Sequence, residues 1–286
     1  MSNTKSKSKT NWLSEDEQQL LAQKLYDNYI RCTDEEQDFQ ILSTIRYDPK
    51  LSASVPETVD EISESNFFLL PEHYHRLQYS FEFFTQGQLD MSKELMVTKL
   101  IGLIRDSKVE VTKPYRIRFL TGLKGEINME IYDTVERKLL DGLEDNLDKY
   151  IVGLDDDIWD VYVDSEPTLI SPFTSFKTTH RPHYTKSRQN HLPGVKTQEE
   201  VLIWNTQQTL MEGSITNFAI KLDGKWVTPE LACGCLCGVM RHFLLKNDYI
   251  SESTIHRSEI LVGDEILLFN GIMGVVRGKI KSIPDI

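Results

Sequence analysis

The spacing of hydrophobic residues along the chain changes from a helical period to an alternating one after residue 106. Apolar residues recur every three or four positions over residues 71–84 and 91–106, which predicts two amphipathic helices. An acidic start and a similar apolar period predict an earlier helix over residues 13–30. Residues 48–65 are polar and contain two prolines, so a loop is predicted there.

Alternating patterns predict strands in the rest of the chain. Residues 115–122 and 126–133 alternate on either side of Leu123–Lys124–Gly125, which predicts a β-hairpin. A second hairpin is predicted within residues 214–229, where Asp223–Gly224 is a typical two-residue turn. The remaining predicted elements are strands over 157–166 and 199–206, a helix over about 236–245, and a β-rich end over 264–283.

Composition shifts and prolines divide the chain into parts. Residues 1–12 are polar and rich in serine and lysine, which predicts a disordered tail. Residues 166–174 carry two prolines and are the predicted linker between an N-terminal α/β lobe, residues 13–165, and a C-terminal lobe, residues 175–286. Helices and strands are mixed in both lobes, so the predicted fold class is α+β or α/β with two lobes.

Charge and composition narrow the classes of partner. The chain has 286 residues, of which 40% are hydrophobic and 27% charged, and its net charge is −12 at pH 7, as in many globular proteins. An acidic chain without a long basic cluster is expected to bind no nucleic acid. The start lacks the apolar core of a signal peptide, and the apolar stretch 266–276 is too short for a bilayer. A cytoplasmic location without membrane contact is therefore expected.

Three of the four cysteines stand on alternate positions, at Cys233, Cys235 and Cys237. A zinc site with His242 is one interpretation, but zinc-binding cysteines are usually two to four residues apart, so no metal is expected. Small apolar packing residues are the alternative. The interleaved glycines precede a predicted helix, and the unpaired N–H groups at a helix start can bind an anion such as phosphate.

A set of spaced residues in the second half resembles the signature of class IV aminotransferases. It consists of Glu212, an asparagine five residues later, Thr228, and the Gly238–Arg241 start of the predicted helix. Ala219 and Trp226 depart from the pattern, both at packing positions of a strand. The resemblance implies fold type IV, in which pyridoxal 5′-phosphate lies between a smaller N-terminal and a larger C-terminal domain.

The same resemblance implies which residues contact that cofactor. Lys177 in SFKTTHR matches the lysine that the family bonds to pyridoxal 5′-phosphate, and Glu212 matches the carboxylate opposite its ring nitrogen. Arg76 in HYHRL matches the arginine that holds the phosphate. The other implied cofactor contacts are the backbone amides of Val239 and Met240 and a hydroxyl of Ser214 or Thr216. The family also implies a homodimer.

Longer phrases, such as SEPTLISPFTSFKTTHRPHY and GDEILLFNGIMGVVRG, are most similar to the lyase branch of the family. This implies a small-molecule substrate, 4-amino-4-deoxychorismate, which is split into pyruvate and 4-aminobenzoate. The residues expected to meet the substrate carboxylates are Asn270, Arg181 and Arg46. Three alternatives stay open: an aminotransferase of the same fold for branched-chain or D-amino acids, a binding protein without activity, and a zinc module.

Overall fold

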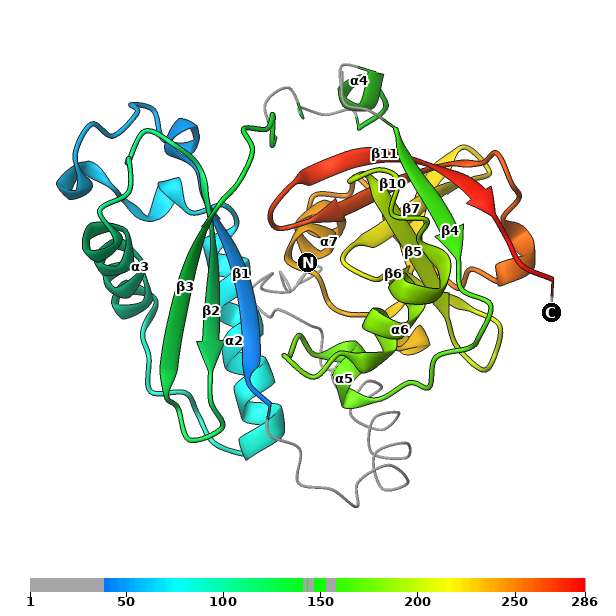
Figure 1. The fold of residues 1–286 in the computed structure, drawn as a ribbon, viewed down its shortest axis with the longest axis horizontal. Coiled ribbons are helices and arrows are strands. Elements are labelled where there is room, and N and C mark those ends of the chain that lie inside the picture. Colours follow the sequence, from blue (N-terminus) through cyan, green and yellow to red (C-terminus); the bar gives the residue numbers. More distant parts are fainter. Residues whose placement is uncertain (1–38, 141–142, 144–146, 153–157, 286) are drawn as a thin grey trace, which may run out of the picture.

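The computed structural model describes residues 39–140, 143, 147–152 and 158–285, and Figure 1 shows two lobes that lie side by side. One lobe is built on a three-stranded sheet and the other on an eight-stranded sheet. The tail predicted over residues 1–12 and the helix predicted over residues 13–30 lie outside the described residues. In the described part of the chain, no helix is long and apolar enough to cross a membrane.

The smaller sheet is antiparallel and its strands follow chain order. Its strands are β1 (Ile41–Tyr47), β2 (Tyr115–Thr121) and β3 (Ile127–Asp133). The pairing of β2 with β3 confirms the first predicted hairpin. The two predicted amphipathic helices are confirmed as α2 (Leu70–Thr85) and α3 (Lys93–Ser107). Their apolar faces, with Leu77 and Leu100 in the middle, share one core with the sheet.

The larger sheet has the strand order β6-β5-β4-β11-β10-β7-β8-β9. Its strands are β4 (Trp159–Val163), β5 (Glu199–Trp204), β6 (Leu210–Gly213), β7 (Asn217–Leu222), β8 (Lys225–Pro229), β9 (Ser251–Ser253), β10 (Glu265–Asn270) and β11 (Gly274–Ser282). Strand β4 runs parallel to both of its neighbours. The second predicted hairpin is confirmed: Asp223 and Gly224 join β7 to β8, both with positive φ, 48° and 78°.

Four α-helices accompany the larger sheet. They are α4 (Leu147–Val152), α5 (Pro172–Ser175), α6 (Pro182–His191) and α7 (Val239–Lys246). Five short 3-10 helices complete the described elements: Pro49–Leu51, Val59–Glu61, Glu64–Asn66, Leu231–Cys233 and Arg257–Glu259. Helix α7 lies against the sheet in Figure 1, and its Met240 and Leu244 pack in one core with Phe269 of β10. This packing fixes where the helix begins.

The strand at 159–163 differs from the sequence analysis in the lobe to which it belongs. The sequence analysis assigned it to the N-terminal lobe, whereas β4 pairs with β5 and β11 of the larger sheet. Along the chain, the predicted linker over residues 166–174 therefore comes after β4, which is the first strand of the larger sheet, and not before it. Composition marks an irregular segment, but it does not show which sheet the preceding strand joins.

Two elements that shape the site were not predicted. Helix α6 has no apolar stripe, and its only buried residues are Tyr184 and Ser187. Strand β1 is buried on both faces and includes the polar Ser43 and Arg46, so its sequence shows no alternation. In neither segment does a hydrophobic period in the sequence mark the element.

A short stretch of backbone pairing joins the two lobes. Leu42 N donates to Lys177 O at 2.8 Å, and Thr179 N donates to Gln40 O at 2.9 Å. Residues 177–179 therefore run along the free edge of β1, although they belong to the chain of the larger lobe. This pairing places the backbone of Lys177 at the junction of the lobes.

Candidate active site

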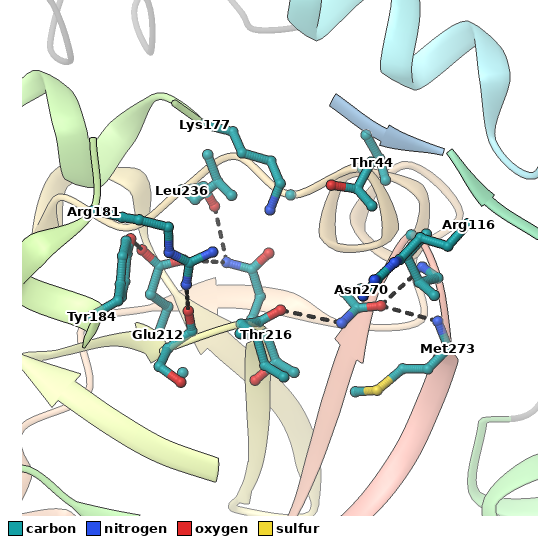
Figure 2. Close-up of a pocket in the computed structure, with 18 of the residues that line it drawn as sticks. Thr44, Arg116, Lys177, Arg181, Tyr184, Glu212, Thr216, Leu236, Asn270 and Met273 are labelled. Carbon is teal, nitrogen blue, oxygen red and sulfur yellow. Dashed lines mark hydrogen bonds between the residues drawn. The ribbon is translucent and has the colours of Figure 1, made fainter. Parts of the chain in front are cut away.

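A cavity of about 370 Å³ lies where the two lobes meet. Its walls include residues of β1, β2 and α2 from the smaller lobe, and of β6, β7, β10 and the start of α7 from the larger one. Figure 2 shows the Lys177 side chain between two groups, with Arg181, Tyr184 and Glu212 on one side and Thr44, Arg116 and Asn270 on the other.

The amine of Lys177 faces this cavity (Figure 2). Burial lowers the pKa of the amine from 10.5 to about 7, and the positive charges of Arg76 and Arg181 act in the same direction. The charge of Glu212 raises the pKa of Lys177 instead. A lysine with a pKa near 7 has a large neutral fraction around neutral pH, and the neutral amine is the nucleophile and the base.

Glu212, at the end of β6, is 2% exposed and held by two side chains. Its Oε1 accepts a hydrogen bond from the Tyr184 hydroxyl at 2.5 Å, and its Oε2 accepts one from Asn217 Nδ2 at 3.3 Å. Burial raises the pKa of the Glu212 carboxyl and of the Tyr184 hydroxyl well above their ordinary values. The Glu212 carboxyl therefore favours its protonated form, and it can share this proton with a basic group that binds beside it.

Arg76, on the cavity side of α2, is buried without a counter-ion. It is 6% exposed, and its hydrogen bond to a side chain runs from Nη2 to Ser43 Oγ at 3.3 Å. Among the described residues, no carboxylate lies in salt-bridge range of its guanidinium, and burial lowers its pKa to about 10. An uncompensated buried cation is costly, so this end of the cavity suits an anion.

The start of α7 adds backbone donors to the same end of the cavity. Gly238 caps the helix without a side-chain hydrogen bond, so the first-turn amides, including those of Val239 and Met240, have no side-chain cap. A Cβ at Gly238 would lie 1.9 Å from Asn217 Oδ1, so only glycine allows this approach. Arg76 and Val239 line the cavity, and Met240, which does not line it, follows Val239 in the same first turn, so this end of the cavity has the donor set of a phosphate site.

The hydroxyls of Ser214 and Thr216 are committed to another partner. Both residues line the cavity, but Ser214 Oγ donates to Glu200 Oε1 at 2.5 Å and Thr216 Oγ1 donates to Glu200 Oε2 at 2.8 Å. A hydroxyl has one hydrogen to donate, so neither donates to a phosphate in this arrangement. The resemblance assigned one of them to the phosphate; the structure instead assigns both to the turn over residues 213–216.

Glu200 organises this turn from within the larger sheet. Its side chain is fully buried and also accepts hydrogen bonds from the backbone amides of Ser214 at 3.0 Å and Ile215 at 3.2 Å. Arg188 Nη1 approaches the same carboxylate at 3.5 Å. A buried carboxylate with so many donors fixes the backbone that leads from Glu212 to Asn217.

Glu200→Gln is expected to lower the free energy of unfolding by about 2–3 kcal/mol, because an amide NH₂ would replace one acceptor oxygen in a buried network of donors. The measurement is equilibrium unfolding in urea. Glu166→Gln is the matched control: its ion pair with Lys186 has both side chains 62% exposed, so a change below about 0.5 kcal/mol is expected. Equal effects of the two substitutions would contradict the role given to Glu200.

Two of the residues expected to meet the substrate line the cavity. Arg181 donates from Nη2 to Ser214 O at 2.7 Å, and its guanidinium lies 5.1 Å from the ring centre of Tyr184. Asn270 uses Oδ1 to accept from the amides of Ile272 at 2.9 Å and Met273 at 3.0 Å (Figure 2). Asn270 thus shapes the turn between β10 and β11 as well as facing the cavity.

The third of these residues is Arg46, and here the sequence analysis was wrong. Arg46 does not line the cavity. It is fully buried, and Nε and Nη2 both donate to Asp48 Oδ2, at 2.9 and 2.7 Å. Nη2 also donates to Val135 O and Nη1 to Ile272 O. All three nitrogens are occupied, so Arg46 ties the smaller lobe to the β10–β11 turn.

Arginines that the sequence analysis did not select line the cavity instead. Arg116, on β2, and Arg137 bring the arginine and lysine residues of the lining to five, with Arg76, Lys177 and Arg181, whereas among the described residues Glu212 is the single carboxylate of the lining. This local excess of positive charge contrasts with the net charge of −12 of the chain. The alternation of YRIRF places Arg116 on the polar face of β2, and that signal was available in the sequence.

The cysteine cluster packs beside the cavity. Cys233, Cys235 and Cys237 are 5%, 1% and 6% exposed and share a hydrophobic core with Met211 and Tyr184. Among the described residues, no group of three or more histidine, cysteine or acidic side chains is arranged to hold a metal. The contacts fit the interpretation of these cysteines as small packing residues that support Glu212 through Tyr184.

Replacing all three of these cysteines by alanine is expected to leave binding of pyridoxal 5′-phosphate unchanged, with a loss of about 1 kcal/mol of unfolding free energy per site. The measurements are a cofactor titration and elemental analysis of the purified proteins. A stoichiometric metal in the wild type that disappears in the triple variant would contradict the packing interpretation.

Sequence comparisons agree with the geometry of this site. The profile of the family described as Amino-transferase class IV matches residues 157–280. An aminodeoxychorismate lyase of Saccharomyces cerevisiae is 32% identical over an alignment of 313 positions, which covers 94% of this chain and 84% of the yeast protein. The similarity therefore extends over both lobes.

Solved structures share the fold at lower identity. The branched-chain amino acid aminotransferase of Escherichia coli matches with a TM-score of 0.57 and 13% identity, over 88% of this chain and 82% of that one. The 4-amino-4-deoxychorismate lyase of Pseudomonas aeruginosa matches with a TM-score of 0.56 and 15% identity, over 84% and 82%. The predicted fold type IV is confirmed, and members of the family use pyridoxal 5′-phosphate. By its similarity to the yeast enzyme along nearly its whole length, the chain belongs to the class IV aminotransferase family.

Proposed function

We propose that this chain is a pyridoxal-phosphate-dependent 4-amino-4-deoxychorismate lyase, which forms pyruvate and 4-aminobenzoate for folate biosynthesis. The observation that carries the proposal is the shared cavity of Lys177, Glu212 and Arg76. This cofactor requires three groups: an amine that can become neutral, a buried carboxylate, and a buried cation without a counter-ion. The reaction is supported by the yeast aminodeoxychorismate lyase, which aligns with 94% of the chain.

The residues of the cavity fit the cofactor. When bound, pyridoxal 5′-phosphate supplies an aldehyde that bonds to amines and a ring that withdraws electrons from the attached carbon. Lys177 would bond to the aldehyde, while Arg76 and the amides of Val239 and Met240 would hold the phosphate. Glu212 would share its proton with the ring nitrogen, because burial makes a lone carboxylate there unfavourable.

Lys177 would also move the proton in the reaction. Its amine would accept the proton from the ring carbon that bears the substrate amino group, because a base with a pKa near 7 exists in its neutral form at physiological pH. The C–O bond between the ring and the side chain then breaks with its electron pair leaving on oxygen, the departing enolate takes up a proton to become pyruvate, which balances the proton that Lys177 accepted, and the ring of the product becomes aromatic. The cavity walls hold the substrate carbon near the amine, which lowers the entropic part of the barrier.

Arginines on both sides of Lys177 would position the two substrate carboxylates. Arg116 is solvent-exposed on β2 and Arg181 lies across the cavity, as Figure 2 shows. Arg137 lines the cavity as well. Guanidinium groups bind carboxylates in two-point geometry, so these residues would select a dianionic substrate over neutral ring compounds.

The rate of cofactor attachment is expected to rise about tenfold per pH unit below pH 7 and to level off above it, because only the neutral amine of Lys177 attacks and its pKa is lowered to about 7. The measurement is the absorbance change after cofactor-free protein is mixed with the cofactor at a series of pH values. Pyridoxal serves as a control, since it has no phosphate that titrates. A rate that keeps rising toward pH 10, as expected for a lysine with the ordinary pKa of 10.5, would contradict the assignment.

A direct assay tests the proposed reaction. The purified chain with pyridoxal 5′-phosphate is given 4-amino-4-deoxychorismate, and 4-aminobenzoate and pyruvate are measured together. Equal release of both products supports the lyase. A protein that binds the cofactor, releases neither product, and passes amino groups from branched-chain or D-amino acids to an oxo acid would be an aminotransferase instead.

We further propose that the enzyme is a homodimer in the cytoplasm, in keeping with the family. Sedimentation of the purified chain across a range of concentrations measures the first property. A single species with the mass of one chain, 33.1 kDa, at micromolar concentration would count against the dimer.

A further inference from the structure

His73 lies one helical turn before Arg76 on α2 and is 1% exposed. Its Nδ1 is 2.8 Å from Ser43 Oγ. Its Nε2 is buried, and among the described residues this atom has no hydrogen-bond partner. A buried ring nitrogen without a partner is unfavourable, so this one indicates a ligand that completes it.

The hydrogen bonds of Ser43 determine which nitrogen of His73 carries the hydrogen. Arg76 Nη2 donates to Ser43 Oγ at 3.3 Å, and arginine has no acceptor, so the serine oxygen accepts this bond. A hydroxyl oxygen can accept two hydrogen bonds, but among the described residues Nδ1 of His73 is the acceptor within reach of the single Ser43 hydrogen, so this hydrogen is directed to Nδ1. Burial and the charges of Arg76 and Lys177 lower the pKa of His73 well below its ordinary value, so the ring is neutral. The hydrogen of the neutral ring consequently sits on the unpartnered Nε2.

This nitrogen borders the anion end of the cavity. A Cβ at Gly271, in the turn between β10 and β11, would lie 2.9 Å from His73 Nε2 and 2.6 Å from Val239 Cγ2. The absence of a side chain at Gly271 thus lets the ring nitrogen, the turn and the start of α7 come together. His73, Arg76, Val239 and Gly271 all line the cavity.

We infer that His73 is an uncharged hydrogen-bond donor to the cofactor phosphate, with its tautomer set by Ser43. The inference deepens the proposed function and depends on it only for the identity of the anion. A neutral donor strengthens the phosphate site without adding charge. A third cation beside Arg76 and Arg181 would lower the pKa of Lys177 further and hinder its return to the protonated form.

The test compares two ligands that differ in the phosphate. Cofactor-free full-length protein is titrated with pyridoxal 5′-phosphate and with pyridoxal. His73→Phe, which keeps a ring but no donor, is expected to weaken binding of the phosphorylated ligand on the order of 10- to 100-fold and binding of pyridoxal less than about 3-fold. His73→Gln, whose amide nitrogen takes the place of Nε2, is expected to stay within about 3-fold of wild type for both.

His75→Phe is the matched control, because His75 is exposed on the same helix. It is expected to bind both ligands as wild type does. Equal weakening of both ligands by His73→Phe would show that His73 acts through the fold and would overturn the inference. Unchanged binding of the phosphorylated ligand would overturn it as well.

A measurement on the wild-type chain needs no variant. In nitrogen-15 spectra of the cofactor-free protein, His73 is expected as the neutral tautomer with hydrogen on Nε2, and its Nε2 signal is expected to shift when inorganic phosphate is added. A hydrogen on Nδ1, or no shift at saturating phosphate, would overturn the inference.

The outcomes separate this inference from the proposed function. The inference alone is overturned if the wild type forms 4-aminobenzoate and the His73→Phe variant still prefers the phosphorylated ligand. A wild type that makes no 4-aminobenzoate but shows the His73-dependent preference overturns the lyase alone. No preference for the phosphorylated ligand in the wild type would overturn both.

Discussion

Lys177→Ala is expected to abolish release of 4-aminobenzoate, with kcat lower by roughly 10⁴-fold or more, because one residue supplies both the bond to the cofactor and the base. Alanine removes the amine that faces the cavity and leaves the backbone pairing of residue 177 with β1 in place. Folding is therefore expected to be preserved. The measurements are turnover of 4-amino-4-deoxychorismate and the absorbance of the bound cofactor.

The loss of turnover has to be specific to this lysine. Lys186→Ala removes an amine whose side chain is 62% exposed and paired with Glu166, so its turnover and cofactor absorbance are expected to match the wild type. Phosphate-dependent cofactor binding is expected to survive in Lys177→Ala, because Arg76 and the start of α7 are untouched. A Lys177→Ala protein that still bonds covalently to the cofactor would assign the role to another lysine.

Glu212→Gln is expected to lower kcat by about 10²–10³-fold while cofactor binding changes far less, because electrostatic stabilisation acts mainly on the charge that develops during reaction. The carboxyl can share a proton with a ring nitrogen, whereas the glutamine amide has no acidic proton to share. The substitution keeps the size of the side chain and one oxygen for the bond from the Tyr184 hydroxyl at 2.5 Å. Steady-state kinetics and a cofactor titration separate the two effects.

Tyr184→Phe is the companion variant for this prediction. It removes the hydroxyl donor but keeps the carboxyl and the ring that packs with the cysteines. A smaller loss, about tenfold in kcat, is expected, because the hydroxyl only orients Glu212 and favours its charged form. If Glu212→Gln lowered cofactor binding as much as kcat, the carboxyl would serve in binding rather than in the reaction.

Local patterns in the sequence determined much of the secondary structure. The helical period over 71–84 and 91–106 and the alternation around 123–125 appear in the structure as α2, α3 and the β2–β3 hairpin. Each of these depends on contacts between residues close in the chain, which a period of 3.6 or 2 records directly. Helix α6 lacks such a period because only Tyr184 and Ser187 of it are buried.

The sequence also contained the residues of the candidate cofactor site as a spaced pattern. Lys177, Glu212 and Arg76 stand far apart in the chain, and their resemblance to the family signature identifies them without their positions in space. The structure brings all three to one cavity. Arg76 lies on α2 and Glu212 on β6, whereas Lys177 lies in the segment between α5 and α6 that pairs with β1.

Only the tertiary structure decided which other polar residues face that cavity. Arg46 and Arg116 lie opposite each other in the β1–β2 register, yet Arg46 is fully buried among protein acceptors and Arg116 lines the cavity. The hydroxyls of Ser214 and Thr216 turn away to Glu200, while His73 presents an unpartnered nitrogen.

These differences depend on partners distant in the sequence. Two features bring the lobes together: the pairing of residues 177–179 with β1 and the place of β4 in the larger sheet. Neither produces a hydrophobic period in the local sequence. The chain's own patterns thus determined helices α2, α3 and α7 and the two hairpins and, through the family resemblance, its candidate cofactor-binding residues. Which donors remain unpaired toward the cavity was decided by packing between the lobes, because a polar side chain bonds to whatever acceptor the fold places within reach.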